Sequence, residues 1–226
     1  MKLRTPLQGI LFDFDGLILD TETPVYQAWQ EKFTALGQPL DMEDWAGILG
    51  KASHEVDLIL SKLDGVLDES SRKGFLEEVA QNEMELILLQ QPLPGVVELI
   101  RKAHEAGMRL GIVSSSDQDW VHSHLKRLEL LDYFHHTSCF DEVKAAKPDP
   151  ALYELGLKKT GLEAERVVVL EDSPNGVLAA KRAGLYTIAV PNGITRRVPF
   201  NENGGRPDQV LDSLEDFPWE EMMRDS

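Results

Sequence analysis

The sequence predicts an α/β protein that combines a doubly wound parallel sheet with a separate, all-helical module. Short apolar segments alternate with helical segments from residue 96 to residue 190, and this alternation is typical of a parallel sheet with helices on both faces. Between residues 20 and 91 the pattern favours helices and shows no convincing strand. We therefore expect a helical module that interrupts the sheet-forming part of the chain.

The expected elements begin with a strand over residues 10–12, a short apolar run of the kind buried in parallel sheets. Thr23 and Pro24 then mark a helix start, and the helix is expected over residues 25–36. Trp219, near the C-terminus, is expected to pack on the surface of the core. Further helices are expected over residues 53–62, 69–89, 96–106, 118–128, 150–160 and 175–183, and further strands over residues 109–113, 138–140, 166–170 and 186–190.

The composition excludes several classes of function. The 226 residues suffice for one large or two modest domains with a proper core. Lys and Arg number 23 against 39 Asp and Glu, which gives a formal net charge of −16. This charge argues against binding to nucleic acid or to an anionic membrane, because both favour surplus cations. A single cysteine allows no intrachain disulfide, and no apolar run reaches the roughly 20 residues of a membrane span. We expect a cytoplasmic, soluble protein.

Two carboxylates follow the first strand, Asp13 and Asp15, and Gly16 comes directly after them. In open parallel sheets, ligands sit beyond the carboxyl ends of the strands. Two like charges so close need a cation or a shared proton, and oxygen ligands suit Mg²⁺. An ordinary turn is the alternative, since Asp and Gly often follow a strand for that reason alone.

Two further segments carry groups that suit a phosphate. Ser114, Ser115 and Ser116 follow the strand at 109–113 and open a helix, and a helix N-terminus binds anions through its free N–H groups. Simple N-capping by serine is the alternative. Lys147 stands before Pro148, and a fixed ammonium can neutralise a phosphoryl oxygen. A solvated surface lysine is the alternative there.

Glu171 and Asp172 end the most apolar strand of the chain, at residues 166–170. Unpaired carboxylates in such a place cost several kcal/mol, so a bound cation is the better explanation. His135, His136 and Cys139 lack the spacing of a tetrahedral metal site, and we assign no histidine to the site.

With these four segments at hand (residues 13–22, 114, 146–149 and 170–176), the chain resembles the haloacid dehalogenase superfamily, and within it the branch of β-phosphoglucomutase-like phosphatases. The resemblance covers almost the whole chain. It implies a Rossmann-like core over residues 1–17 and 91–226 and an inserted helical cap domain over residues 18–90.

The resemblance implies a role for each motif residue. Asp13 would be the nucleophile that forms an aspartyl-phosphate, and Asp15 would act first as general acid and then as general base. Ser114, Ser115 and Lys147 would hold the phosphoryl oxygens. An acid at the position of Asp15 speaks against the dehalogenases and phosphonate hydrolases of the superfamily.

The same resemblance implies a Mg²⁺ site. Its ligands would be Asp13, the backbone carbonyl of Asp15 and Asp172, with Glu171 close by or acting through water. Lys51 lies in the cap, where a surface lysine or a lysine that contacts the substrate is favoured over a Schiff-base lysine.

The function implied is a Mg²⁺-dependent phosphatase that hydrolyses a small phosphorylated metabolite, with a sugar phosphate as the favoured substrate. A phosphomutase is one alternative, although the mutases resembled here carry a cap histidine where this chain has Val25. A catalytically silent metabolite-binding protein on the same fold is the other. A monomer is expected.

Overall fold

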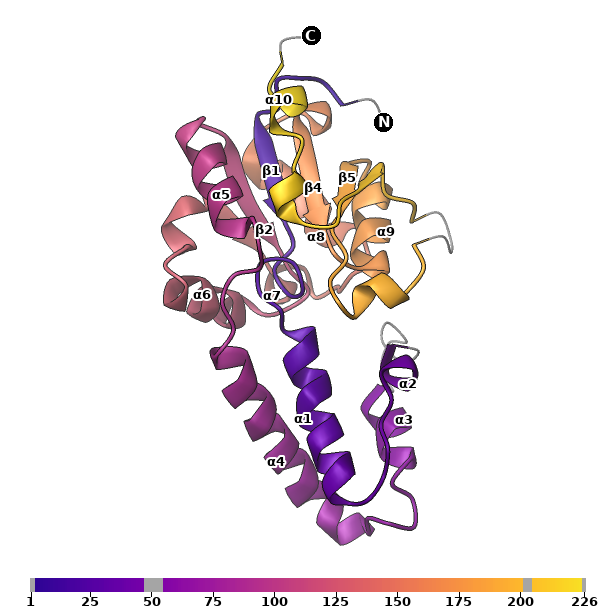
Figure 1. The fold of residues 1–226 in the computed structure, drawn as a ribbon. Helices are drawn as coiled ribbons and strands as arrows, with labels where there is room; N and C mark the ends of the chain where they lie inside the picture. Colours follow the sequence, from indigo (N-terminus) through magenta and orange to yellow (C-terminus); the bar gives the residue numbers. More distant parts are fainter. Residues whose placement is uncertain (1–2, 47–54, 201–204, 225–226) are drawn as a thin grey trace.

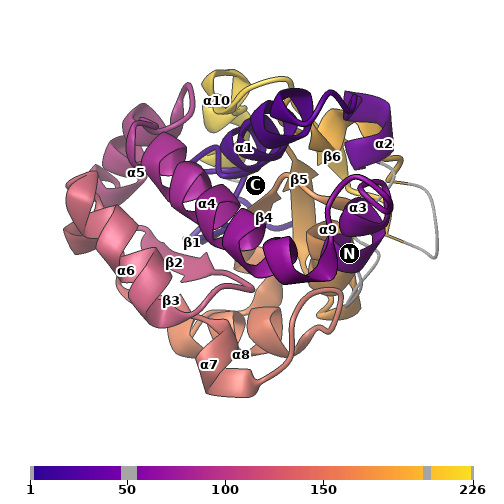
Figure 2. The same cartoon turned by 90° about the horizontal axis from the view of Figure 1, so that it is seen from below.

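The computed structural model describes residues 3–46, 55–200 and 205–224. Its centre is a six-stranded sheet whose neighbouring strands all run parallel, in the order β3-β2-β1-β4-β5-β6. Figure 1 labels β1, β2, β4 and β5 of this sheet, and Figure 2 also labels β3 and β6. The expected α/β fold with a parallel sheet is confirmed. The strands are β1 (Gly9–Phe12), β2 (Arg109–Val113), β3 (His136–Ser138), β4 (Val167–Glu171), β5 (Tyr186–Ala189) and β6 (Gln209–Val210).

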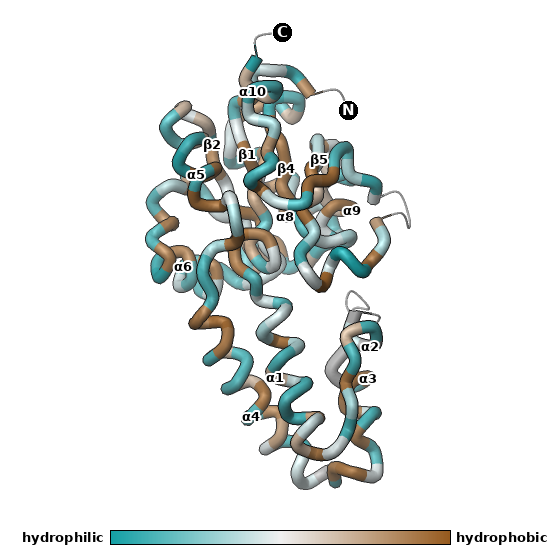
Figure 3. The backbone as a smooth tube through the Cα atoms, viewed as in Figure 1, coloured by the Kyte–Doolittle hydropathy of each residue, from teal (hydrophilic) through white to brown (hydrophobic). Residues whose placement is uncertain are grey.

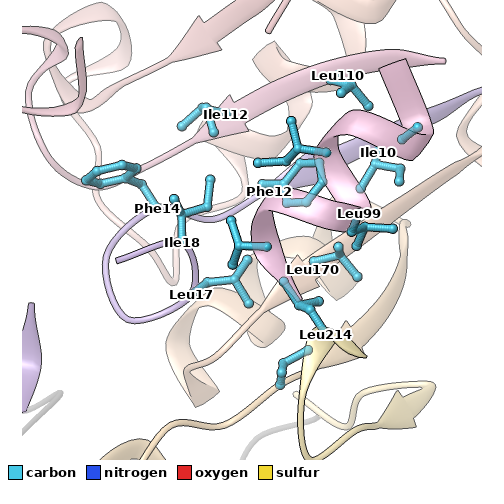
Figure 4. Packing of buried hydrophobic residues seen from close by; sticks show 14 of the residues in the cluster. Ile10, Phe12, Phe14, Leu17, Ile18, Leu99, Leu110, Ile112, Leu170 and Leu214 are labelled. Carbon is cyan, nitrogen blue, oxygen red and sulfur yellow. The ribbon is translucent and has the colours of Figure 1, made fainter. Parts of the chain in front are cut away.

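Helices cover both faces of this sheet. Successive side chains along a strand point to opposite faces, and they accordingly enter different hydrophobic clusters. Phe12 packs with residues of α5 (Val96–Glu105) and α6 (Gln118–Arg127) on one face, where Figure 4 shows it among Leu110, Ile112 and Leu170. Leu11 packs with residues of α8 (Ala151–Thr160) and α9 (Pro174–Arg182) on the other. In Figure 3 the tube is accordingly hydrophobic along β4, where Val167 to Leu170 are all apolar.

In the part of the chain that the structure describes, four helices lie between β1 and α5: α1 (Glu22–Ala35), α2 (Met42–Ala46), α3 (Glu55–Ser61) and α4 (Glu69–Leu88). We call them the helical insert. They have a hydrophobic cluster of their own that includes Trp29, Phe33 and Phe75. In Figures 1 and 2 they lie beyond the carboxyl ends of the strands, on the side opposite the chain termini. The expected helical interruption is therefore present, and the domain limits at residues 17 and 91 stay a prediction.

The two chain crossings into the insert run side by side. Leu19 forms an isolated bridge with Pro92, and the Leu93 N–H donates to the Ile18 carbonyl at 3.0 Å. This pairing holds both connections at the end of β1, which is where Asp13 and Asp15 lie. Among the described helices, none is both long enough and apolar enough to cross a membrane.

Some expected boundaries were wrong. The strand expected at 138–140 is β3, which ends at Ser138, and Phe140 instead begins the short helix α7 (Phe140–Val143). The reason is a local cap, since Glu142 accepts a hydrogen bond from the Cys139 N–H at 3.1 Å. Helix α1 begins at Glu22 rather than at residue 25. Neither α2 nor β6 was expected. Trp219, at the start of α10 (Trp219–Met222), packs on the main hydrophobic cluster as expected.

Candidate active site

The carboxyl ends of β1 and β4 meet at one edge of the sheet, because these strands are parallel neighbours in register. The Asp13 N–H donates to the Leu170 carbonyl at 2.9 Å, which continues the ladder one residue past β1. Asp13, Glu171 and Asp172 are all buried, and their ligand atoms lie within 4.8 Å of one another. The structure thus brings together three of the carboxylates that the sequence singled out.

Lys147 lies at the centre of this cluster. Its ammonium is paired with Asp13 and, at 2.7 Å, with Glu171, and it donates to the Val113 carbonyl at 2.9 Å. Its side chain is only 6% exposed, so Lys147 is not a solvated surface lysine. Burial alone would lower the pKa of Lys147, but the adjoining Asp13 and Glu171 carboxylates outweigh burial and raise that pKa. The side chain is a fixed positive charge beside Asp13.

Glu171 is held by four donors of the protein. Its Oε1 accepts from Lys147 and, at 3.0 Å, from the Tyr153 hydroxyl. Its Oε2 accepts from the Ser173 N–H at 2.9 Å and from the Ser173 hydroxyl at 3.1 Å. A carboxylate with so many protein donors has little capacity left for a ligand. The geometry therefore favours Glu171 as the group that fixes Lys147.

The charges in the cluster do not balance. Three carboxylates and one ammonium leave two negative charges among Asp13, Glu171, Asp172 and Lys147. Burial, followed for Asp172 by the Glu171 charge, raises the pKa of Asp172 well above its usual range. Burial likewise raises the pKa of Asp13, although Lys147 opposes it. A divalent cation would remove this imbalance, and oxygen ligands are those that Mg²⁺ prefers. The residues present fit a Mg²⁺ site.

The carboxylate of Asp15 is not part of that cluster and is held by donors from the segment after β2. Its Oδ2 accepts from the Ser114 hydroxyl at 3.2 Å and from the Ser116 hydroxyl at 2.7 Å. Its Oδ1 accepts from the indole N–H of Trp120 at 2.9 Å. Ser114 thus contacts the expected acid/base residue, and a phosphoryl oxygen would have to share or replace that contact.

Gly16 lies between the first motif and the acids of β4. Its φ is +85°, and a Cβ built there would lie 2.4 Å from Asp172 Oδ2 and 2.7 Å from Asn192 Nδ2. Both the backbone conformation and the close approach therefore require glycine. Asn192 Nδ2 donates to Asp172 Oδ2 at 2.8 Å and to the Gly16 carbonyl at 3.1 Å, so this amide connects the two segments.

Two expected site residues, Ser115 and Lys51, remain. Ser115 is exposed, and its hydroxyl accepts from the Lys147 N–H at 3.1 Å. Lys51 lies outside the described residues.

Sequence reasoning missed three side chains that hold the site: Tyr153, Trp120 and Asn192. It considered Ser116 only among the serines that suit a phosphate and not as a partner of Asp15. Ser116 and Asn192 had a usable signal, because each follows an expected strand within a few residues at the same edge of the sheet. Trp120 and Tyr153 sit inside helices, where a packing role is the simpler interpretation of an aromatic residue.

Three buried acids and a buried lysine lie together at the carboxyl ends of strands in a parallel sheet. This arrangement fits an enzyme centre for a metal ion and an anion. The model of the family described as haloacid dehalogenase-like hydrolase matches residues 10–190, most of the chain. The chain belongs to the haloacid dehalogenase-like hydrolases.

Its relatives include phosphatases. It is 34% identical over 208 residues to a Bacillus subtilis protein provisionally named phosphatase YhcW, with 91% of this chain and 93% of that protein covered. It is 30% identical over 217 residues to the phosphorylated carbohydrates phosphatase of Thermotoga maritima, with 93% of this chain and 99% of that protein covered. Among solved structures, CbbY from Rhodobacter sphaeroides in complex with phosphate is similar at 27% identity and a TM-score of 0.70, with 94% of this chain and 96% of CbbY covered.

Proposed function

We propose that this hydrolase is a Mg²⁺-dependent phosphatase that acts on small phosphorylated metabolites through an aspartyl-phosphate, with sugar phosphates as the first class to test. The observation that carries the proposal is the buried cluster of Asp13, Glu171 and Asp172 closed by Lys147. The phosphorylated carbohydrates phosphatase among its relatives supports the choice of substrate class.

In the first half of the reaction, a carboxylate oxygen of Asp13 forms a bond to phosphorus while the bond from phosphorus to the alcohol oxygen breaks. Asp15 gives its proton to that alcohol oxygen, so that a neutral alcohol leaves. Lys147 supports the attack in two ways. It favours the charged form of Asp13, whose burial disfavours that form, and its positive charge attracts the phosphoryl group.

In the second half, Asp15 takes a proton from a water molecule whose oxygen attacks the phosphorus of the aspartyl-phosphate. The bond from phosphorus to the Asp13 oxygen breaks, which regenerates the carboxylate and releases inorganic phosphate. Hydrogen bonds from Ser116 and Trp120 hold Asp15 for both transfers. One difficult displacement is thereby divided into two easier ones.

Asp13, Asp172 and the backbone carbonyl of Asp15 would hold the metal, with Glu171 close by. When bound, Mg²⁺ supplies charge neutralisation and Lewis-acid stabilisation of the phosphoryl oxygens. The helical insert lies over this edge of the sheet, and we propose that it serves as a cap that excludes water around the reacting groups.

The test is release of free phosphate from a panel of phosphorylated sugars and other metabolites, with and without Mg²⁺. We expect release from a few of them that requires the metal. Asp13→Asn should abolish release while the protein stays folded, and Asp132→Asn, at an exposed position, should leave it unchanged. Turnover by Asp13→Asn would refute the assigned nucleophile.

Two other outcomes would replace the proposal. Conversion of β-glucose 1-phosphate to glucose 6-phosphate without phosphate release would indicate a mutase, despite Val25. Binding of metabolites without either reaction would indicate a binding protein. Light scattering on the same samples tests the expected monomer.

A further inference from the structure

The loop after β5 lies beside the proposed metal site. β5 is the parallel neighbour of β4, and the Val190 N–H donates to the Glu171 carbonyl at 2.7 Å. The chain then passes Asn192 and enters the short 3-10 helix η3 (Thr195–Arg197). Asn192 is therefore placed next to Asp172 by the sheet itself.

The side-chain amide of Asn192 is fully engaged. Its Nδ2 donates to Asp172 Oδ2 at 2.8 Å and to the Gly16 carbonyl at 3.1 Å. Its Oδ1 accepts from the N–H groups of Ile194 and Thr195, both at 2.9 Å. Four hydrogen bonds use both donors and both lone pairs of the amide. One side chain thus ties the loop to the metal-site carboxylate and to the turn after β1.

Two residues further on, Ile194 belongs to a different part of the protein. It is 1% exposed and is a member of the hydrophobic cluster of the helical insert, together with Trp29 and Trp45. Among the described residues, it is the one member of that cluster that lies outside residues 22–88, which hold the four helices of the insert and their connections. Helix α2 also contacts η3. The insert therefore docks on this loop through an apolar side chain.

We infer that Asn192 is a positioning residue for the metal site and that Ile194 makes its placement depend on docking of the insert. The inference rests on the proposed Mg²⁺ site. A short loop whose N–H groups are bound by Asn192 Oδ1 cannot shift at Ile194 without moving the amide that holds Asp172. Substrate enclosure by the insert and assembly of the metal site are then linked.

The test measures the Mg²⁺ dissociation constant by calorimetry on the whole chain without substrate. Asn192→Ala should weaken Mg²⁺ binding about 10- to 100-fold, as is typical when a partner of a ligating carboxylate is removed. Asn192→Ser, which keeps a small polar side chain, should give a smaller loss and serves if the alanine variant does not fold. In phosphate release, excess Mg²⁺ should restore the rate of either variant, which a general loss of structure would not allow.

A matched pair of variants isolates the role of Ile194. Ile194→Ala and Ile59→Ala remove the same atoms from the same cluster, since Ile59 of α3 is 2% exposed there. Only Ile194 lies on the loop of Asn192. We expect Ile194→Ala to weaken Mg²⁺ binding about fivefold and Ile59→Ala to leave it unchanged. In the Asn192→Ala background, Ile194→Ala should have no further effect on Mg²⁺ binding, because the amide that connects Ile194 to Asp172 is already absent.

Equal effects of Ile194→Ala and Ile59→Ala would overturn the inference, as would unchanged Mg²⁺ binding by Asn192→Ala. In either case metal-dependent phosphate release by the unaltered protein would leave the proposed function intact. If the unaltered protein binds no Mg²⁺, the proposed metal site is wrong and the inference with it.

Discussion

Gly176 is the position at which a single methyl group should do most damage to the site. It lies in the first turn of α9, and a Cβ built there would be 1.6 Å from Glu171 Oε1 and 1.9 Å from Glu171 Cδ. The carboxylate would have to move, and with it the ion pair to Lys147. Gly176→Ala therefore breaks a buried charge contact without removing any of its members.

The magnitude follows from two opposing contributions. Separating one partner from a buried ion pair lowers the free energy of unfolding by about 3–5 kcal/mol. Alanine in place of a helical glycine raises it by about 1 kcal/mol. We expect Gly176→Ala to lower the free energy of unfolding by about 2–4 kcal/mol. Phosphate release should fall as well, because Lys147 loses one of the groups that fix it beside Asp13.

Gly74 is the matched control. It lies in α4, is exposed, and has no atom within 4 Å of a Cβ built on it. Gly74→Ala should therefore raise the free energy of unfolding by up to about 1 kcal/mol, through helix propensity alone. Urea unfolding followed by circular dichroism compares the two variants, whose predicted effects have opposite sign. A Gly176→Ala variant as stable as the unaltered protein would refute the reasoning about Glu171.

Three further predictions concern other parts of the chain. In urea unfolding, Gly16→Ala should lower the free energy of unfolding more than Gly107→Ala does. Both glycines have a positive φ, but of the two, Gly16 alone has atoms within 3 Å of the new Cβ. Equal losses would contradict the prediction. Trp120→Phe should lower kcat for phosphate release about tenfold with KM unchanged, because Asp15 loses one hydrogen-bond donor. The loss in kcat should be larger for alkyl phosphates than for aryl phosphates. A change in KM alone would contradict this role of Trp120. Burial lowers the pKa of His136 from 6.5 to about 4, so the unfolded chain binds the proton first and stability should fall as pH drops from 6.5 towards 4. Thermal melting of His136→Gln should show a smaller fall than the unaltered protein over that range.

Much of the fold and part of the site could be predicted from the sequence, because the relevant signals are local. An apolar run that ends in acids shows both a buried strand and the groups at its carboxyl end, as for Asp13 and for Glu171 with Asp172. The alternation of segments likewise predicts the parallel sheet and the helical interruption. The periodicity that marks each single helix or strand lies within a window of about a dozen residues, and the alternation follows from the order of these segments along the chain.

Only the tertiary structure decided which side chains, far apart in the sequence, contact one another at the site. Trp120 contacts Asp15 across 105 positions of the chain, and Asn192 contacts Gly16 across 176. Ile194 follows a core strand and yet packs in the insert. Local periodicity carries no information about such pairs, because they depend on strand order and on how the insert lies against the sheet. The sequence by itself determined the kinds of group at the strand ends, and packing determined that Glu171 holds Lys147 and that Asn192 holds Asp172.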